Sequence, residues 1–210
     1  MIFINTEKAF KNALNLTKKY SSTKILINSL SILKINKSNC LRKIIFTFIE
    51  VFIALIMATQ INTIALTKDV FEAIISIIIA LIAIVFTGYA FFQALVNNKM
   101  LITLLSVDDE QGGNLAQTNK YFAEVMIFQI ACLLIDLLIV IFTMILPQEW
   151  FLFENNATNE LLATLGIFIG LHLNMESIWE MKSFIFNVFQ LFNLHAYSRM
   201  AEIKEQEKDE

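Results

Sequence analysis

The sequence predicts an all-α, polytopic membrane protein with four transmembrane helices, both termini in the cytoplasm, and a long fourth helix that extends into the cytoplasm. Hydrophobic residues make up 57% of the 210 residues and charged residues only 17%, whereas soluble domains have about 45–50% apolar and about 25% charged residues. The apolar residues are also grouped, because residues 73–96 contain no charge and residues 125–146 contain one. About 20 apolar helical residues cross the roughly 30 Å apolar core of a bilayer. The lipid bilayer is therefore the first expected partner.

Three of the predicted spans follow directly from the apolar pattern. The first is expected over residues 44–66, after a pair of basic residues, and the second over residues 70–96. The third is expected over residues 122–146, because the single proline of the chain, Pro147, cannot continue a helix. The connection between the first two spans is short, whereas the second and third spans are separated by residues 97–121.

The fourth predicted span is less apolar than the others. Its charge-free stretch, residues 161–171, is too short to cross a bilayer, so the helix must take His172 and Glu176 into the membrane. The helical pattern continues as far as Tyr197, and the acidic residues beyond it indicate a solvated tail.

Basic residues decide the predicted orientation, because Lys and Arg favour the cytoplasmic ends of spans. Residues 1–43 carry nine of them, residues 97–120 carry two and residues 180–210 carry four, whereas the connections on the opposite side carry only Lys68. We therefore expect a basic cytoplasmic segment over 1–43, a transmembrane region over 44–179, and a cytoplasmic helix extension with an acidic tail over 180–210. This topology is that of a multi-pass protein of the inner (plasma) membrane.

The amino-terminal segment has a basic helical pattern with two interpretations. Lys8, Lys11, Lys18 and Lys19 recur at helical spacing, which is typical of an amphipathic helix on the inner membrane surface. The same lysines could instead contact an anionic ligand such as a nucleotide, because basic clusters attract phosphates. Nucleic acid is the weaker partner class, since no aromatic or Arg residues are interleaved with these lysines.

Polar side chains inside the predicted spans are the principal functional candidates, because an ionisable group at this depth costs at least about 2.5–3.5 kcal/mol on insertion scales. At 1.5 Å per residue, Asp136 and His172 lie near the centre of the membrane, and Glu50 and Glu176 lie nearer the cytoplasm. At about 100° per residue, one polar stripe runs along the fourth helix from His172. The candidate pore-lining or intramembrane polar residues are Glu50, Gln129, Asp136, His172, Glu176, Glu180, Ser183, Asn187 and Gln190.

The polar stripe has three interpretations. Leu165 and Ile169 extend it as an apolar constriction, and such a constriction gates a pore by dewetting. Alternatively the polar groups form a buried network in which Asp136 pairs with His172. His172 and Glu176 also have the spacing of metal ligands, but no third ligand stands at a fitting distance in the sequence. We therefore expect no metal and no cofactor.

Small residues predict where helices approach each other closely. They recur on the second span at alternating steps of four and three, and a GxxxG pair lies on the fourth span. The helix-packing candidates are Ser76, Ala80, Ala83, Thr87, Gly166 and Gly170.

The function expected first is a homo-oligomeric channel or pore, in which several copies place the fourth helix around an axis and an acidic ring favours cations. A cytoplasmic signal ligand or partner protein would open it. The bias toward Ile, Asn and Lys is typical of an AT-rich bacterium, in which a membrane-disrupting pore could act in antiviral defence. The alternative is a non-conducting interaction protein, such as an immunity or accessory protein. An enzyme is not expected, because the sequence contains no nucleophile and base motif.

Overall fold

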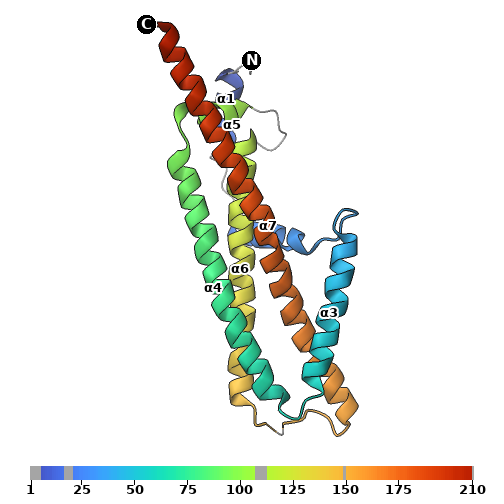
Figure 1. Cartoon of the computed structure of the whole chain (residues 1–210). Coiled ribbons are helices and arrows are strands. Elements are labelled where there is room, and N and C mark those ends of the chain that lie inside the picture. Colours follow the sequence, from blue (N-terminus) through green and yellow to red (C-terminus); the bar gives the residue numbers. More distant parts are fainter. Residues whose placement is uncertain (1–5, 17–20, 107–112, 149, 210) are drawn as a thin grey trace. The chain divides into compact units, whose positions relative to one another are not determined.

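The computed structural model describes the chain except for residues 1–5, 17–20, 107–112, 149 and 210. The chain is 88% helical and the described residues contain no strand, which confirms the all-α prediction. In chain order the elements are α1 (Thr6–Leu16), α2 (Ser22–Ser29), the 3-10 helix η1 (Leu30–Leu33), α3 (Cys40–Ala58), α4 (Thr63–Leu95), α5 (Asn98–Ser106), α6 (Gly113–Ile145) and α7 (Asn156–Asp209) (Figure 1).

Within the part of the chain that the structure describes, three helices are long and apolar enough to cross a membrane, namely α4, α6 and α7. Helices α4 and α6 have 33 residues each, or about 50 Å at 1.5 Å per residue, which exceeds the roughly 30 Å apolar core of a bilayer. The helix α3 is shorter, at 19 residues, and carries three charged side chains. Helices α4, α6 and α7 therefore have the length and composition of membrane-spanning segments.

The turn between α3 and α4 lies earlier in the chain than predicted. The expected span over residues 44–66 is wrong in its end, because α3 stops at Ala58 and α4 begins at Thr63. The hydroxyl of Thr63 lies 2.6 Å from the carbonyl oxygen of Gln60, and the hydroxyl of Thr59 lies 3.1 Å from that of Leu55. The Thr63 hydroxyl also lies 3.1 Å from the carbonyl oxygen of Met57 and 3.2 Å from that of Ala58, so it contacts carbonyl groups at the end of α3 that no following turn of helix covers.

The last helix is longer at both ends than predicted. The side chain of Asn155 accepts a hydrogen bond from the backbone N–H of Ala157 at 3.0 Å, which caps the start of α7. The acidic tail is helical as far as Asp209, and an ion pair of 3.0 Å between Arg199 and Glu202 lies on it. By contrast, α6 ends at Ile145, where the following proline predicted its end.

The chain divides into two compact units. Unit 1 comprises residues 1–29, 84–127 and 181–210, and unit 2 comprises residues 30–83 and 128–180. Unit 1 is held by aromatic side chains of α4, α6 and α7: the rings of Phe92 and Phe122 stack with centroids 5.9 Å apart, and Phe184 meets Phe122 edge-on at 5.5 Å. In the same unit α1 packs on α5, where the amide of Asn12 donates to the Leu105 carbonyl oxygen at 2.7 Å.

Unit 2 has an apolar core at the α3–α4 turn and a close helix contact on α7. Ala54, Met57 and Ile167 are buried in this core. Gly170 is buried and lies close to the ring of Phe71. A Cβ atom added at Gly170 would lie only 2.5 Å from the Phe71 Cζ atom. Unit 2 also contains most of the polar groups considered below.

Candidate functional site

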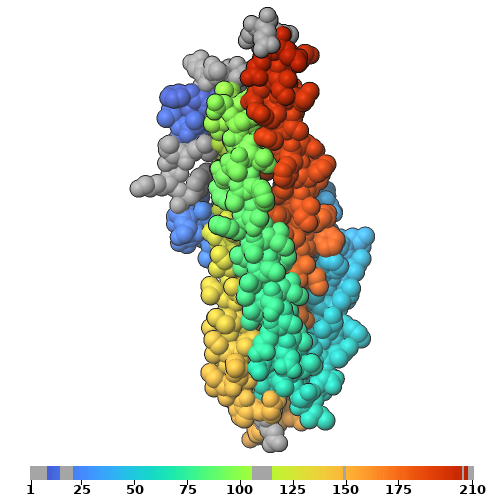
Figure 2. Space-filling view, turned by 60° about the vertical axis from the view of Figure 1, so that its left-hand side comes forward, coloured from blue at the N-terminus to red at the C-terminus, as the bar shows by residue number. Residues whose placement is uncertain are grey.

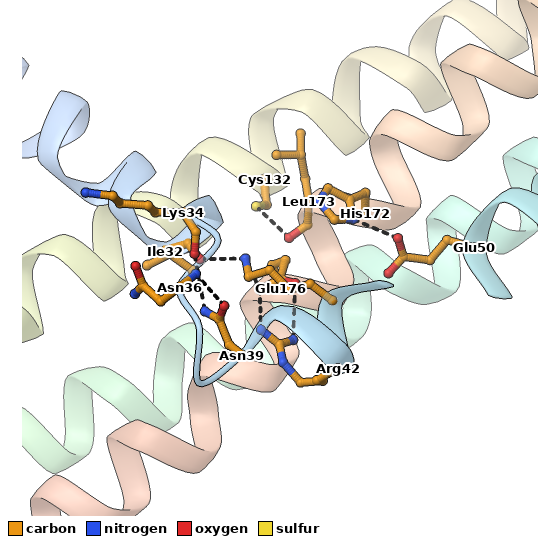
Figure 3. Close-up of polar contacts among 11 residues, drawn as sticks. Ile32, Lys34, Asn36, Asn39, Arg42, Glu50, Cys132, His172, Leu173 and Glu176 are labelled. Carbon is orange, nitrogen blue, oxygen red and sulfur yellow. Dashed lines mark hydrogen bonds and ion pairs between the residues drawn. The ribbon is translucent and has the colours of Figure 1, made fainter. Parts of the chain in front are cut away.

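The centre of the polar site is the carboxylate of Glu176, which is 2% exposed. Arg42 donates two hydrogen bonds to it, from Nη1 to Oε1 at 3.1 Å and from Nη2 to Oε2 at 3.0 Å. Lys43 Nζ lies 2.9 Å from Oε2, and the Lys43 side chain is only 3% exposed. Figure 3 shows how α3 and α7 bring these groups together. The Glu176 carboxylate is thus neutralised by two cations of the same unit.

The two cations of α3 have further contacts. Lys43 Nζ donates to the carbonyl oxygen of Ile32 in η1 at 3.0 Å. The Arg42 guanidinium lies 4.9 Å from the ring centroid of Trp179, and the Phe46 ring meets Trp179 edge-on at 5.2 Å. A cation over an indole face is attracted by the ring quadrupole. These contacts hold the start of α3 and η1 against α7.

A second polar contact, between a histidine and a carboxylate, joins the same two helices. His172 Nδ1 lies 2.7 Å from Glu50 Oε2, and Glu50 is 2% exposed, whereas the His172 side chain is 26% exposed (Figure 3). The His172 ring also stacks on Phe168, with centroids 5.6 Å apart. The structure therefore pairs His172 with Glu50 and not with Asp136.

The third buried carboxyl group lies between α6 and α7. Asp136 is fully buried and accepts a hydrogen bond from the Asn174 amide at 2.7 Å. One turn earlier on α6, the Cys132 thiol lies 3.7 Å from the carbonyl oxygen of Leu173 (Figure 3), and Gln129 is buried on the same helix. Among the described residues no three metal-ligating side chains come together.

The remaining candidates of the polar stripe lie farther along α7 and are less buried. Glu180 is half-buried at the end of unit 2. In unit 1, Ser183 and Asn187 are half-buried and Gln190 is exposed. The two candidates for an apolar gate are on the surface of unit 2, with Leu165 53% and Ile169 48% exposed.

The small residues of α4 lie on its exposed face. Phe71, Ile78, Val85 and Phe92 recur every seven residues and are at most 2% exposed, so they form the buried side of the helix. The small residues stand about 100–180° from Phe71 at 100° per residue. All of them are exposed, namely Ser76, Ala80, Ala83, Thr87, Ala90 and Ala94. We call these six residues the α4 small-residue face, and Figure 2 shows the side of α4 (green) that is turned outward.

The two glycines of the GxxxG pair have different surroundings. Gly170 is in close contact with a buried ring, whereas a Cβ atom at Gly166 would meet nothing within 4 Å. Of the four amino-terminal lysines, Lys11 is exposed on α1 and Lys8 lies on the same helix. Lys18 and Lys19 lie outside the described residues.

Sequence reasoning missed three residues of this site and Ser177, a further buried polar residue of α7. Arg42 and Lys43 were interpreted only as the basic border of the first span, and Asn174 and Ser177 were not considered. Gly170, Asn174 and Ser177 stand about 140–200° from His172 at 100° per residue, so a second polar stripe on the opposite side of α7 was the available signal.

Comparison of the chain with models of protein families, with functionally characterised proteins and with solved structures finds no match.

Proposed function

We propose that this protein is a non-conducting membrane interaction protein that associates with a second copy of itself through the α4 small-residue face. The observation that carries the proposal is the pairing of the intramembrane acids. Glu176 has two cations and Glu50 has a histidine within one subunit. A cation pore needs such carboxylates to face the passage, whereas these groups serve to join α3 to α7.

The pairing also supports α3 as a fourth membrane span. Three charged side chains would make α3 costly to insert on its own, but each of them has an oppositely charged or histidine partner on α7. Its 19 residues extend about 28 Å, close to the thickness of the apolar core. With four spans, the excess of Lys and Arg places both termini in the cytoplasm.

Cysteine labelling in intact cells tests this topology. Cysteines replacing Gln60, in the α3–α4 turn, and Leu152, between α6 and α7, should react with a membrane-impermeant maleimide from outside. Cysteines replacing Lys11 and Lys204, which are exposed, should react only after the membrane is made permeable. Labelling of the Gln60 position on the same side as the Lys204 position would exclude α3 as a span.

Self-association is argued from the shape and spacing of the α4 small-residue face. In lipid, helices gain little from burying apolar surface, so they associate where small residues let their backbones approach. Steps of four and three residues keep such a face in register along two helices that cross at about 20°. The face repeats over 76–94 and consists of exposed side chains. A second copy offers the same flat face, which makes it a suitable occupant.

Replacement of Ala80 by leucine should weaken this association about tenfold or more, which corresponds to about 1.4 kcal/mol, because the added side chain separates the two helices. Single-molecule counting of labelled protein in liposomes measures the fraction of dimers. Ile79→Leu is the matched control, since Ile79 is 53% exposed but lies beside the small-residue face. Equal dimer fractions for the two variants would contradict association through this face.

A homo-oligomeric channel is the second candidate, and the half-exposed polar side chains of α7 in unit 1 favour it. Ser183, Asn187 and Gln190 would line its cytoplasmic part, and in bacterial defence its opening would disrupt the membrane of an infected cell. Ion flux measured in the same liposomes distinguishes the two candidates. If the protein is a non-conducting interaction protein, the flux should equal that of vesicles without protein. Flux above that level, lost on replacing Asn187 by leucine, would favour the channel.

A further inference from the structure

Asp136 differs from Glu50 and Glu176 because, among the described residues, neither a cation nor a histidine is paired with it. Among the described residues it forms no ion pair, and its hydrogen-bond partner is the neutral amide of Asn174. The other buried polar groups of α6 in unit 2 are the Cys132 thiol, one turn before Asp136, and the Gln129 amide, two turns before it. On α7, Asn174 and Ser177 are buried and uncharged. At the contact between α3 and α7 in unit 2, His172 is engaged with Glu50, and Glu176 is engaged with Arg42 and Lys43.

The orientation of the Asn174 amide follows from its two acceptors. Its Nδ2 atom donates to Asp136 Oδ1 at 2.7 Å and to the Gly170 carbonyl oxygen at 2.8 Å. An amide nitrogen has two N–H groups, so both are used. The flipped amide would place its oxygen against two acceptors, which excludes that orientation.

Within this pair two buried oxygen atoms have no hydrogen-bond partner among the described residues, namely Asp136 Oδ2 and Asn174 Oδ1. Other buried side-chain oxygen atoms of this kind include Glu50 Oε1, Glu124 Oε1 and Ser177 Oγ. An ionised carboxylate and an amide carbonyl can only accept hydrogen bonds, so neither satisfies the other. A buried acceptor without a donor costs free energy, and a buried charge without a counter-ion costs more. One proton on Asp136 Oδ2 removes both costs, because the acid O–H can then donate to Asn174 Oδ1.

We propose that Asp136 binds a proton in the folded protein and forms a neutral carboxylic acid–amide pair with Asn174. In this pair the Asn174 N–H donates to Asp136 Oδ1 and the Asp136 O–H donates to Asn174 Oδ1. The site is a proton-binding site between two helices that have the composition of membrane spans. It is independent of the proposed self-association, because it involves α6 and α7 and not the exposed face of α4.

Isotope-edited infrared spectroscopy of the intact protein in liposomes at neutral pH tests the proposal without a variant. The wild-type protein should show the carbonyl band of a protonated carboxylic acid, and this band should shift when the aspartate side chains carry ¹³C. The band should be lost in Asp136→Asn and retained in Glu176→Gln. A wild-type spectrum without an aspartate-dependent band of this kind would overturn the proposal.

Unfolding provides a second measurement with a matched pair of substitutions. In Asp136→Asn the new amide N–H replaces the acid O–H as donor to Asn174 Oδ1, so the unfolding temperature in detergent should stay close to that of the wild type. Glu176→Gln makes the same chemical change at an ionised group and should lower the temperature clearly. A clear rise in the unfolding temperature of Asp136→Asn would mean that the substitution had removed an uncompensated buried charge, and would refute the proton site.

Discussion

Replacement of Glu176 by glutamine should destabilise the protein by about 3–5 kcal/mol, the range for removing one partner of a buried ion pair. The carboxylate accepts hydrogen bonds from Nη1 and Nη2 of Arg42 and lies 2.9 Å from Lys43 Nζ. Glutamine removes the negative charge and leaves two cations, one of them 3% exposed, without compensation. Unfolding of the purified protein in detergent, followed by circular dichroism, measures the loss.

Two comparisons separate the loss of the ion pair from a general effect of glutamine. Glu160→Gln changes an exposed acid on the same helix and should alter the free energy of unfolding by no more than about 0.5 kcal/mol. In the second comparison Lys43→Met is combined with Glu176→Gln. The double variant should lose less than the sum of the single variants, because they remove one shared interaction. Additive losses would show that Lys43 and Glu176 act separately.

The shared helix face of His172 and Glu176 could be predicted from the sequence, but their partners could not. Spacing along α7 placed His172 and Glu176 on one face, and the structure keeps them together opposite α3. Helical spacing says nothing about which helix covers that face, so a passage between subunits and a contact with α3 were equally compatible with it. The close contact of Asn174 with Asp136 depends on which side of α7 faces α6, which is a property of tertiary packing.

The ends of the helices show the same limit. Pro147 predicted the end of α6 because a proline stops a helix by its covalent structure. The α3–α4 turn contains neither proline nor glycine, and it is made by hydroxyl groups of Thr59 and Thr63 that contact nearby carbonyl oxygens. Threonine also occurs within apolar helices, so these residues did not mark a turn until the carbonyl groups beside them were known.

Replacement by alanine should have opposite effects on stability at the two glycines of the α7 pair, Gly170 and Gly166. A Cβ atom at Gly170 would lie 2.5 Å from Cζ and 2.6 Å from Cε1 of Phe71, and 3.2 Å from Cδ1 of Ile139. The Phe71 ring is fully buried, so it cannot move into solvent. Overpacking costs about 1–3 kcal/mol, whereas alanine gains up to about 1 kcal/mol over glycine as a helix former. Gly170→Ala should therefore lower the free energy of unfolding by up to about 2 kcal/mol.

At Gly166 the same substitution meets nothing within 4 Å, so only the gain in helix propensity remains and Gly166→Ala should stabilise the protein by up to about 1 kcal/mol. Detergent unfolding of both variants measures the difference in sign. Trimming the ring by Phe71→Leu should recover part of the loss in Gly170→Ala, because the clash is with the ring itself. Stabilisation by both alanines would contradict a close contact between Phe71 and α7, and the GxxxG pair would then have no packing role within unit 2.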